Sequence, residues 1–98
     1  MNVIEIEKDL IPYTFEIELE NEVFVFEIDY NERYDFFTVT LYKNDIVLVQ
    51  GEKIILNRPL FEGVSDVNLP KVTITPVSNS EGRITFDNLG ESVFLKVE

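Results

Sequence analysis

The sequence contains neither cysteine nor histidine. Without cysteine, the chain has no disulfide bond, no thiolate ligand for a metal and no thiol nucleophile. Without histidine, it also lacks the side chain that most often serves as general base and as metal ligand near neutral pH. These two absences exclude most enzymatic and metal-binding chemistries. We therefore predict a protein that is not an enzyme and that carries no cofactor.

Long hydrophobic runs are also missing. The first five residues have neither the basic start nor the apolar stretch of a secretory signal. No segment approaches the roughly 20 consecutive apolar residues that span a bilayer. We expect a soluble protein that is made in the cytoplasm and has no membrane partner.

Basic residues are scarce, because eight Lys and Arg stand against nineteen Asp and Glu, for a net charge of -11. Residues 1–35 hold eleven acidic and two basic residues, a net charge of -9. Residues 36–98 hold eight acidic and six basic residues, a net charge of -2. A field of this sign repels phosphate, so we predict no nucleic-acid partner. The acidic half is then a solvated face, a docking surface for a basic partner, or a wall along which DNA slides without sticking.

Alternating residues dominate the stretch from Phe15 to Tyr42. Three segments within it are separated near residues 21–22 and 31–33, where Asn and Glu favour turns. Their apolar sides are formed by Phe15, Ile17 and Leu19, by Phe24, Phe26, Ile28 and Tyr30, and by Phe37, Val39 and Leu41. This period of two predicts a three-stranded antiparallel meander with one buried face.

Shorter extended segments flank this meander. Residues 1–11 form either an N-terminal arm or an edge strand. The apolar run 46–49 predicts a buried strand, and residues 54–56 form either another short strand or an extended lead into the turn at residues 57–59. Residues 71–77 predict a strand that stops at Pro76 and forms a hairpin with residues 83–86, and residues 92–97 predict the last strand. The sequence thus predicts one all-β domain over residues 1–98, a small antiparallel β-barrel or two-layer β-sandwich of about seven or eight short strands with no long helix.

A series of short motifs follows one order along residues 12–95. They are the strand with Phe15, Ile17 and Leu19, Tyr30-Asn31-Glu32-Arg33, the strand from Phe37 to Tyr42, an apolar run ending at Gly51, and Phe86-Asp87-Asn88-Leu89-Gly90 before Val93 and Leu95. In this order they resemble the small baseplate plug proteins of contractile-tailed bacteriophages, the family that includes the cyanophage plug. The chain departs from that family at Phe37, where Trp is frequent, at Asn21-Glu22, where Gly is frequent, and at Lys96-Val97, where an aromatic is frequent.

The resemblance implies a structural role in a virion. A protein of this family would be a non-enzymatic part of a bacteriophage or prophage tail, made in the host cytoplasm. It would plug or line the centre of the baseplate at the end of the tail tube and contact hub and spike proteins. Its position on the tail axis implies a homo-oligomer, either a trimer or a ring.

Seven residues are candidates for the interface. Phe36, Tyr42 and Phe94 project opposite to the expected core, so they belong either to a second core or to a subunit contact. Arg33 either pairs with Asp35 or Asp29 across its turn, where Asn31 would adopt the left-handed conformation, or reaches a neighbouring subunit. The remaining three are the carboxylates on the polar side of the first strand, Glu16, Glu18 and Glu20.

Two other function classes stay open. An acidic DNA mimic that inhibits a nucleic-acid enzyme would account for the charge and size, although it should carry charge over most of its surface. A generic β binding module for a peptide or a sugar would expose a pocket or an open sheet edge. Asp29, Asn31 and Asp35 have part of the spacing of a calcium loop, but its glycine and distal glutamate are missing, so we predict no metal site.

Overall fold

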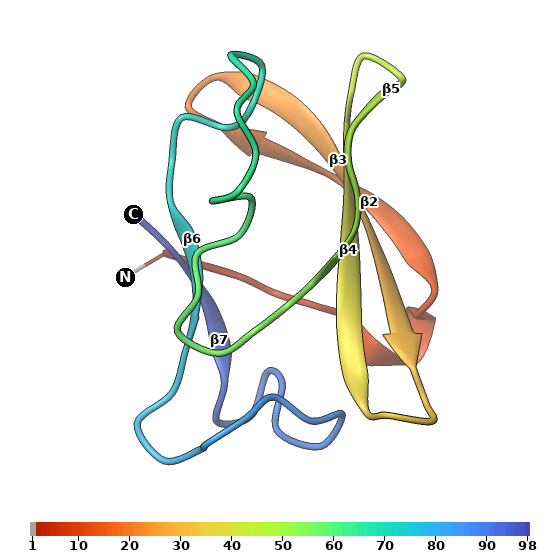
Figure 1. Ribbon diagram of the computed structural model, residues 1–98, viewed down its shortest axis with the longest axis vertical. Helices are drawn as coiled ribbons and strands as arrows, with labels where there is room; N and C mark the ends of the chain where they lie inside the picture. Colours follow the sequence, from red (N-terminus) through yellow and green to blue (C-terminus); the bar gives the residue numbers. More distant parts are fainter. Residues whose placement is uncertain (1) are drawn as a thin grey trace.

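The computed structural model describes residues 2–98 and contains seven strands in two antiparallel sheets (Figure 1). The larger sheet has the order β2-β3-β4-β5, with bounds Tyr13–Leu19, Glu22–Asn31, Phe36–Lys43 and Ile46–Lys53. The smaller sheet has the order β1-β7-β6, with bounds Asn2–Ile4, Phe94–Val97 and Ile74–Val77. A single 3-10 turn, η1 (Lys8–Leu10), lies between β1 and β2.

This architecture confirms the predicted all-β class. Figure 1 shows β6 and β7 on one side of the molecule and the four-stranded sheet on the other. The two sheets do not close into a barrel, so the arrangement is that of a sandwich. Within residues 2–98 no helix has the length and apolar character needed to cross a bilayer.

The core lies between the two sheets and contains residues from both. Phe24, Phe26 and Phe37 of the larger sheet are fully buried, and Ile74 and Leu95 of the smaller sheet pack in the same cluster. The period-two alternation along β2, β3 and β4 therefore predicted the correct buried face. It also explains why these three strands pair in register as a meander.

Two-residue turns join two of the three hairpins of the larger sheet, β2-β3 and β4-β5. Glu20 and Asn21 connect β2 to β3 with φ values of 51° and 66°, and Asn44 and Asp45 connect β4 to β5 with φ values of 53° and 65°. Two successive positive φ values are the signature of the type I′ turn, whose twist matches that of the flanking strands. The first turn thus lies one residue earlier than the predicted break at residues 21–22.

The prediction that residues 46–49 form a buried strand was wrong. They begin β5, an edge strand in which Ile46 is 64% and Val47 45% exposed, because no further layer covers that end of the sheet. The strand also continues through Gly51, which adopts φ 63° at an irregular part of the pairing with β4. Residues 54–56 lie outside regular pairing, so of the two alternatives they form the extended lead and not a separate strand.

The predicted hairpin between residues 71–77 and 83–86 was also wrong. β6 pairs with β7 instead, and it includes Pro76 rather than ending there. Proline is tolerated because the other edge of β6 is covered by a loop: Asn57 N donates to Pro76 O (2.7 Å) and Leu60 N donates to Ile74 O (2.8 Å). On this edge β6 accepts both hydrogen bonds from the loop, so the backbone N–H that Pro76 lacks is not needed there.

Residues 83–86 pack instead against the turn between β3 and β4, through Asp35. The Asp35 carboxylate accepts hydrogen bonds from the Tyr30 hydroxyl (2.7 Å) and from Phe86 N (2.8 Å), and Arg83 Nη2 donates to Asp35 O (2.6 Å). The bond from Tyr30 and that from Phe86 hold the pKa of Asp35 below its ordinary value. The same carboxylate raises the pKa of Tyr30 to about 12.

Arg33 does not take the predicted role in this turn. Among the ion pairs of residues 2–98, none joins Arg33 to Asp29 or Asp35; its guanidinium lies 5.4 Å from the centroid of the Tyr34 ring. Asn31 does not adopt the left-handed conformation either. Its side-chain oxygen accepts from Tyr34 N (3.0 Å), and Asp35 takes the left-handed position with φ 54°. The arginine that contacts Asp35 comes from a distant loop, which spacing within the turn cannot reveal.

We predict that Asp35→Asn destabilises the protein in a pH-dependent way. Because the folded-state pKa of Asp35 is lowered, its stabilisation is fully present above the ordinary aspartate pKa and is lost as the pH falls through the folded value. The difference in unfolding free energy between wild type and variant should therefore be large at pH 7 and shrink steadily below pH 4. Urea denaturation across this range measures it. Asp45→Asn, at an exposed turn position, is the control for the loss of one carboxylate.

Candidate functional site

The outer face of the larger sheet points away from the core, and no second layer formed by residues 2–98 lies over it. We define this outer face by the residues that the strand registers place opposite one another on that side. They are Thr14, Glu16 and Glu18 on β2, Val23, Val25, Glu27 and Asp29 on β3, Phe36, Thr38, Thr40 and Tyr42 on β4, and Val47 and Lys53 on β5.

An apolar stripe crosses one end of the outer face. Val25 lies opposite Tyr42, Tyr42 lies opposite Val47, and Val23 precedes Val25 by two residues on the same side of β3. Val23 is 52% exposed, and Val47 is also exposed. We call these four residues the Val-Tyr stripe. Exposed aliphatic and aromatic side chains gathered on one surface are typical of protein contact sites.

Carboxylates border the Val-Tyr stripe. Glu16 is opposite Val25 and Glu18 is opposite Val23, both exposed on the edge strand β2. Along β3 the stripe continues into Glu27 and Asp29. Glu27 is fixed there because its Oε1 accepts a hydrogen bond from the Tyr42 hydroxyl (2.7 Å), and this bond raises the pKa of Tyr42.

The outer face holds four carboxylates and one ammonium group, that of Lys53. Lys53 Nζ lies 4.7 Å from the centroid of the Phe36 ring, at the end of the sheet far from the stripe. Asp29 has no ion-pair partner among residues 2–98. Partial burial raises the pKa of Asp29, and the neighbouring charge of Glu27 raises it further. An approaching cation would stabilise both carboxylates.

The structure brings together four of the seven predicted interface residues. Phe36, Tyr42, Glu16 and Glu18 share the outer face, although Phe36 and Tyr42 lie six residues apart on β4, about 20 Å along the strand. The other three lie elsewhere. Glu20 is in the β2-β3 turn, Arg33 is in the β3-β4 turn, and Phe94 is on the smaller sheet, where it is 37% exposed.

Val47 is the outer-face residue that sequence reasoning placed wrongly. It was expected in a buried strand, whereas the register sets it beside Tyr42 and in solvent. The Asn44-Asp45 turn signal was sufficient to find the pairing. A two-residue turn there makes Lys43 oppose Ile46 and Tyr42 oppose Val47.

The outer face is suited to binding rather than to catalysis. Its carboxylates are exposed or half-buried, and it forms a sheet surface instead of a cleft that could desolvate a reacting group. Within residues 2–98, no group of three or more metal-ligating side chains is arranged to hold an ion. The chemistry present is an apolar stripe with negative charge on two sides, which complements a surface that carries Lys or Arg around an apolar ridge.

Comparison with known proteins gives one family. A family model described as cyanophage baseplate Pam3 plug gp18 matches residues 1–98, the full length of the chain. No curated protein matches the sequence.

We predict that Asp29→Asn raises thermal stability at neutral pH. The folded-state pKa of Asp29 is raised, so the folded state binds this proton more tightly than the unfolded state, and ionisation at pH 7 opposes folding. Asparagine removes that charge. The melting temperature should rise at pH 7, and the gain should disappear below pH 3, where Asp29 is protonated in both states.

Glu18→Gln is the matched control for this experiment. It removes one charge from the same outer face at a position opposite Val23, away from the Glu27 and Asp29 pair. An equal rise in melting temperature for Glu18→Gln would mean that overall charge, and not the crowding of these two carboxylates, opposes folding. Differential scanning calorimetry of both variants decides between the two causes.

Proposed function

Because the chain belongs to the cyanophage baseplate plug family, we propose that it plugs or lines the centre of the baseplate at the end of the tail tube. Membership in this family makes it a structural component of the phage tail baseplate that associates with other baseplate components. The finer proposal is that its partners are hub and spike proteins. We further propose that it is made in the host cytoplasm and carries out no catalysis.

The outer face supports contact with a protein other than a second copy of the chain. Each outer face holds four carboxylates and one ammonium group. If two outer faces met about a two-fold axis, eight carboxylates would therefore be brought together with only two ammonium groups. Like charges in a contact oppose association. A hub or spike surface with Lys or Arg around an apolar ridge avoids this repulsion and covers the Val-Tyr stripe.

A trimer or ring about the tail axis would then use other surfaces. The edges of the larger sheet are available, since β2 and β5 each have a neighbour on one side only. The outer face would be left to the hub or spike partner. The distribution of charge also favours a baseplate role over that of a DNA mimic, because the excess of carboxylates belongs to residues 1–35 instead of the whole surface.

The proposal predicts the behaviour of a phage that lacks this gene. Electron microscopy should show particles without tails, or tails whose tubes are open at the baseplate, and the infectious titre should fall. Wild-type protein supplied in trans should restore both. Particles of normal form and infectivity in the absence of the gene would contradict the plug role.

Complementation with variants tests the contact surface separately. Val23→Asp combined with Val47→Asp places two charges in the Val-Tyr stripe at exposed positions, so folding should be retained while partner binding is lost. Val67→Asp, at a loop residue that is 84% exposed, is the control and should complement fully. If the double variant complements as well as the control, the outer face is not the contact surface, although the plug role would stand.

A further inference from the structure

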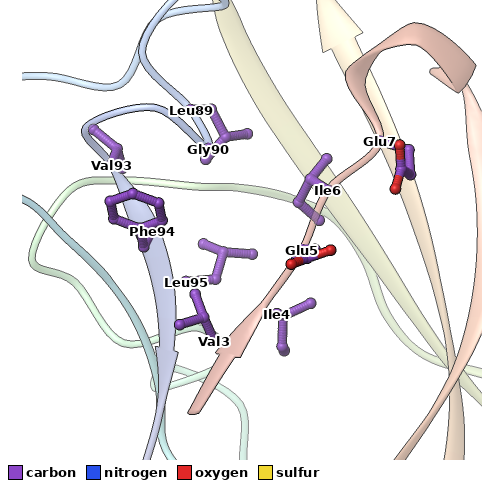
Figure 2. A pocket seen from close by; sticks show the side chains of 10 residues that line it. All are labelled: Val3, Ile4, Glu5, Ile6, Glu7, Leu89, Gly90, Val93, Phe94 and Leu95. Atoms are coloured by element: carbon purple, nitrogen blue, oxygen red, sulfur yellow. The ribbon is translucent and has the colours of Figure 1, made fainter. Parts of the chain in front are cut away.

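A hollow of about 330 Å³ lies beyond the end of the β1-β7 ladder, between the residues that follow β1 and the loop that precedes β7. Figure 2 shows β1 and β7 side by side at the arrow of β1. Beyond Ile4 the segment that follows β1 diverges from β7. The ladder accordingly ends where Ile4 pairs with Leu95. The side chains and backbone around the hollow come from Val3, Ile4, Glu5, Ile6, Glu7, Leu89, Gly90, Val93, Phe94 and Leu95.

The divergence has a cause in the backbone of the loop before β7. In an extended chain, Ile6 would present its N–H and C=O to the same side as Ile4, toward Val93. Val93 is already satisfied, because its N–H donates to Asn88 O (3.0 Å) and its carbonyl accepts from Gly90 N (2.7 Å). The turn at residues 88–93 therefore stops β1 from pairing further and keeps the hollow open. Within residues 2–98, no hydrogen bond to the backbone of Ile6 is present.

The hollow has an apolar floor and an acidic rim. Its accessible apolar side chains are those of Val3, which is 39% exposed, of Phe94 and of the half-buried Ile6, whereas Leu89, Val93 and Leu95 are almost completely buried. Glu5 and Glu7 are exposed, and Figure 2 shows them on the β1 side of the hollow. Among the described residues, 2–98, no basic side chain lines it. The adjacent lysine, Lys8, is engaged elsewhere: its Nζ donates to Phe86 O (2.6 Å) and lies 5.1 Å from the centroid of the Phe86 ring.

We propose that this hollow is a socket for a lysine or arginine side chain from a segment of another protein. Such a side chain has an apolar stem and a cationic head. The stem would pack on Val3, Ile6 and Phe94, and the head would lie between the carboxylates of Glu5 and Glu7. The free carbonyl of Ile6 offers a further acceptor for the head. A purely apolar side chain would leave the two carboxylates without a partner, and an anion would be repelled.

The socket is independent of the outer face. It is formed by β1, β7 and the loop before β7, whereas the outer face belongs to β2-β5. It does not require the chain to act as a plug, so the isolated protein can be tested. Different measurements therefore test the proposed function and the socket.

Two capped peptides that differ in a single group test the socket. Ac-Gly-Lys-Gly-NH₂ carries the stem and the cation, and the norleucine analogue carries the stem alone. In an NMR titration of the full chain, the lysine peptide should shift the side-chain resonances of Val3, Ile6 and Phe94 in a saturable manner. It should bind about fivefold more tightly than the norleucine peptide, the effect of one or two partly exposed charge contacts. The arginine peptide should behave like the lysine peptide.

Glu5→Gln combined with Glu7→Gln should reduce the affinity for the lysine peptide to that for the norleucine peptide. Both residues are exposed and outside the strands, and an unchanged amide spectrum checks that the variant is folded. Glu32→Gln combined with Asp45→Asn removes the same charge from two exposed turns away from the hollow and the outer face, and should leave the affinity unchanged.

Three results would overturn the proposal. These are equal affinity for the lysine and norleucine peptides, shifts that do not saturate, and an equal loss of affinity in the two double variants. The last would show that the general negative field attracts the peptide without a defined socket.

Discussion

Phe24, Phe26 and Phe37 are fully buried between the two sheets, and burial of each such side chain contributes about 1.5–3 kcal/mol to folding. A chain of 98 residues buries a small fraction of its surface compared with larger proteins, so it depends on filling every inner position of its few strands. The cluster accordingly also contains loop residues, Leu60, Phe61, Ile84 and Leu89, which occupy space that no strand fills. With the interior filled in this way, the outer face and the hollow beside the β1-β7 ladder are the surfaces through which we expect the protein to act.

The same alternation that buries one side of each strand sets the chemistry of the other. Because Phe15 and Ile17 point inward, Glu16 and Glu18 point outward, and because Ile28 is buried, Glu27 and Asp29 share the outer side. Their mutual repulsion is tolerated because the core supplies the folding energy. A surface of this kind gains stability when a cation approaches, which is the electrostatic basis for expecting a basic partner in the baseplate.

Loops decide where the sheets stop. The turn at residues 88–93 uses the backbone groups of Val93 and so ends the β1-β7 ladder at Ile4, which leaves a hollow beside it. The carboxylate of Asp35 ties the β3-β4 turn to residues 83–86, although these segments are about fifty residues apart in the chain. These polar contacts define surfaces that neither sheet would form alone.

The sequence by itself determined the all-β class, the buried faces of β2, β3 and β4, the acidic side of β2 and the resemblance to the baseplate plug family. The first three follow from residues close together in the chain, since strand alternation and turn residues act locally, and the resemblance follows from the order of short motifs along residues 12–95. Only the tertiary structure decided that Val47 is exposed, that Arg83 and not Arg33 contacts Asp35, and that β6 pairs with β7. Those outcomes depend on which distant segment covers a given surface, and a local pattern shows that a side chain is apolar without showing whether another layer lies over it.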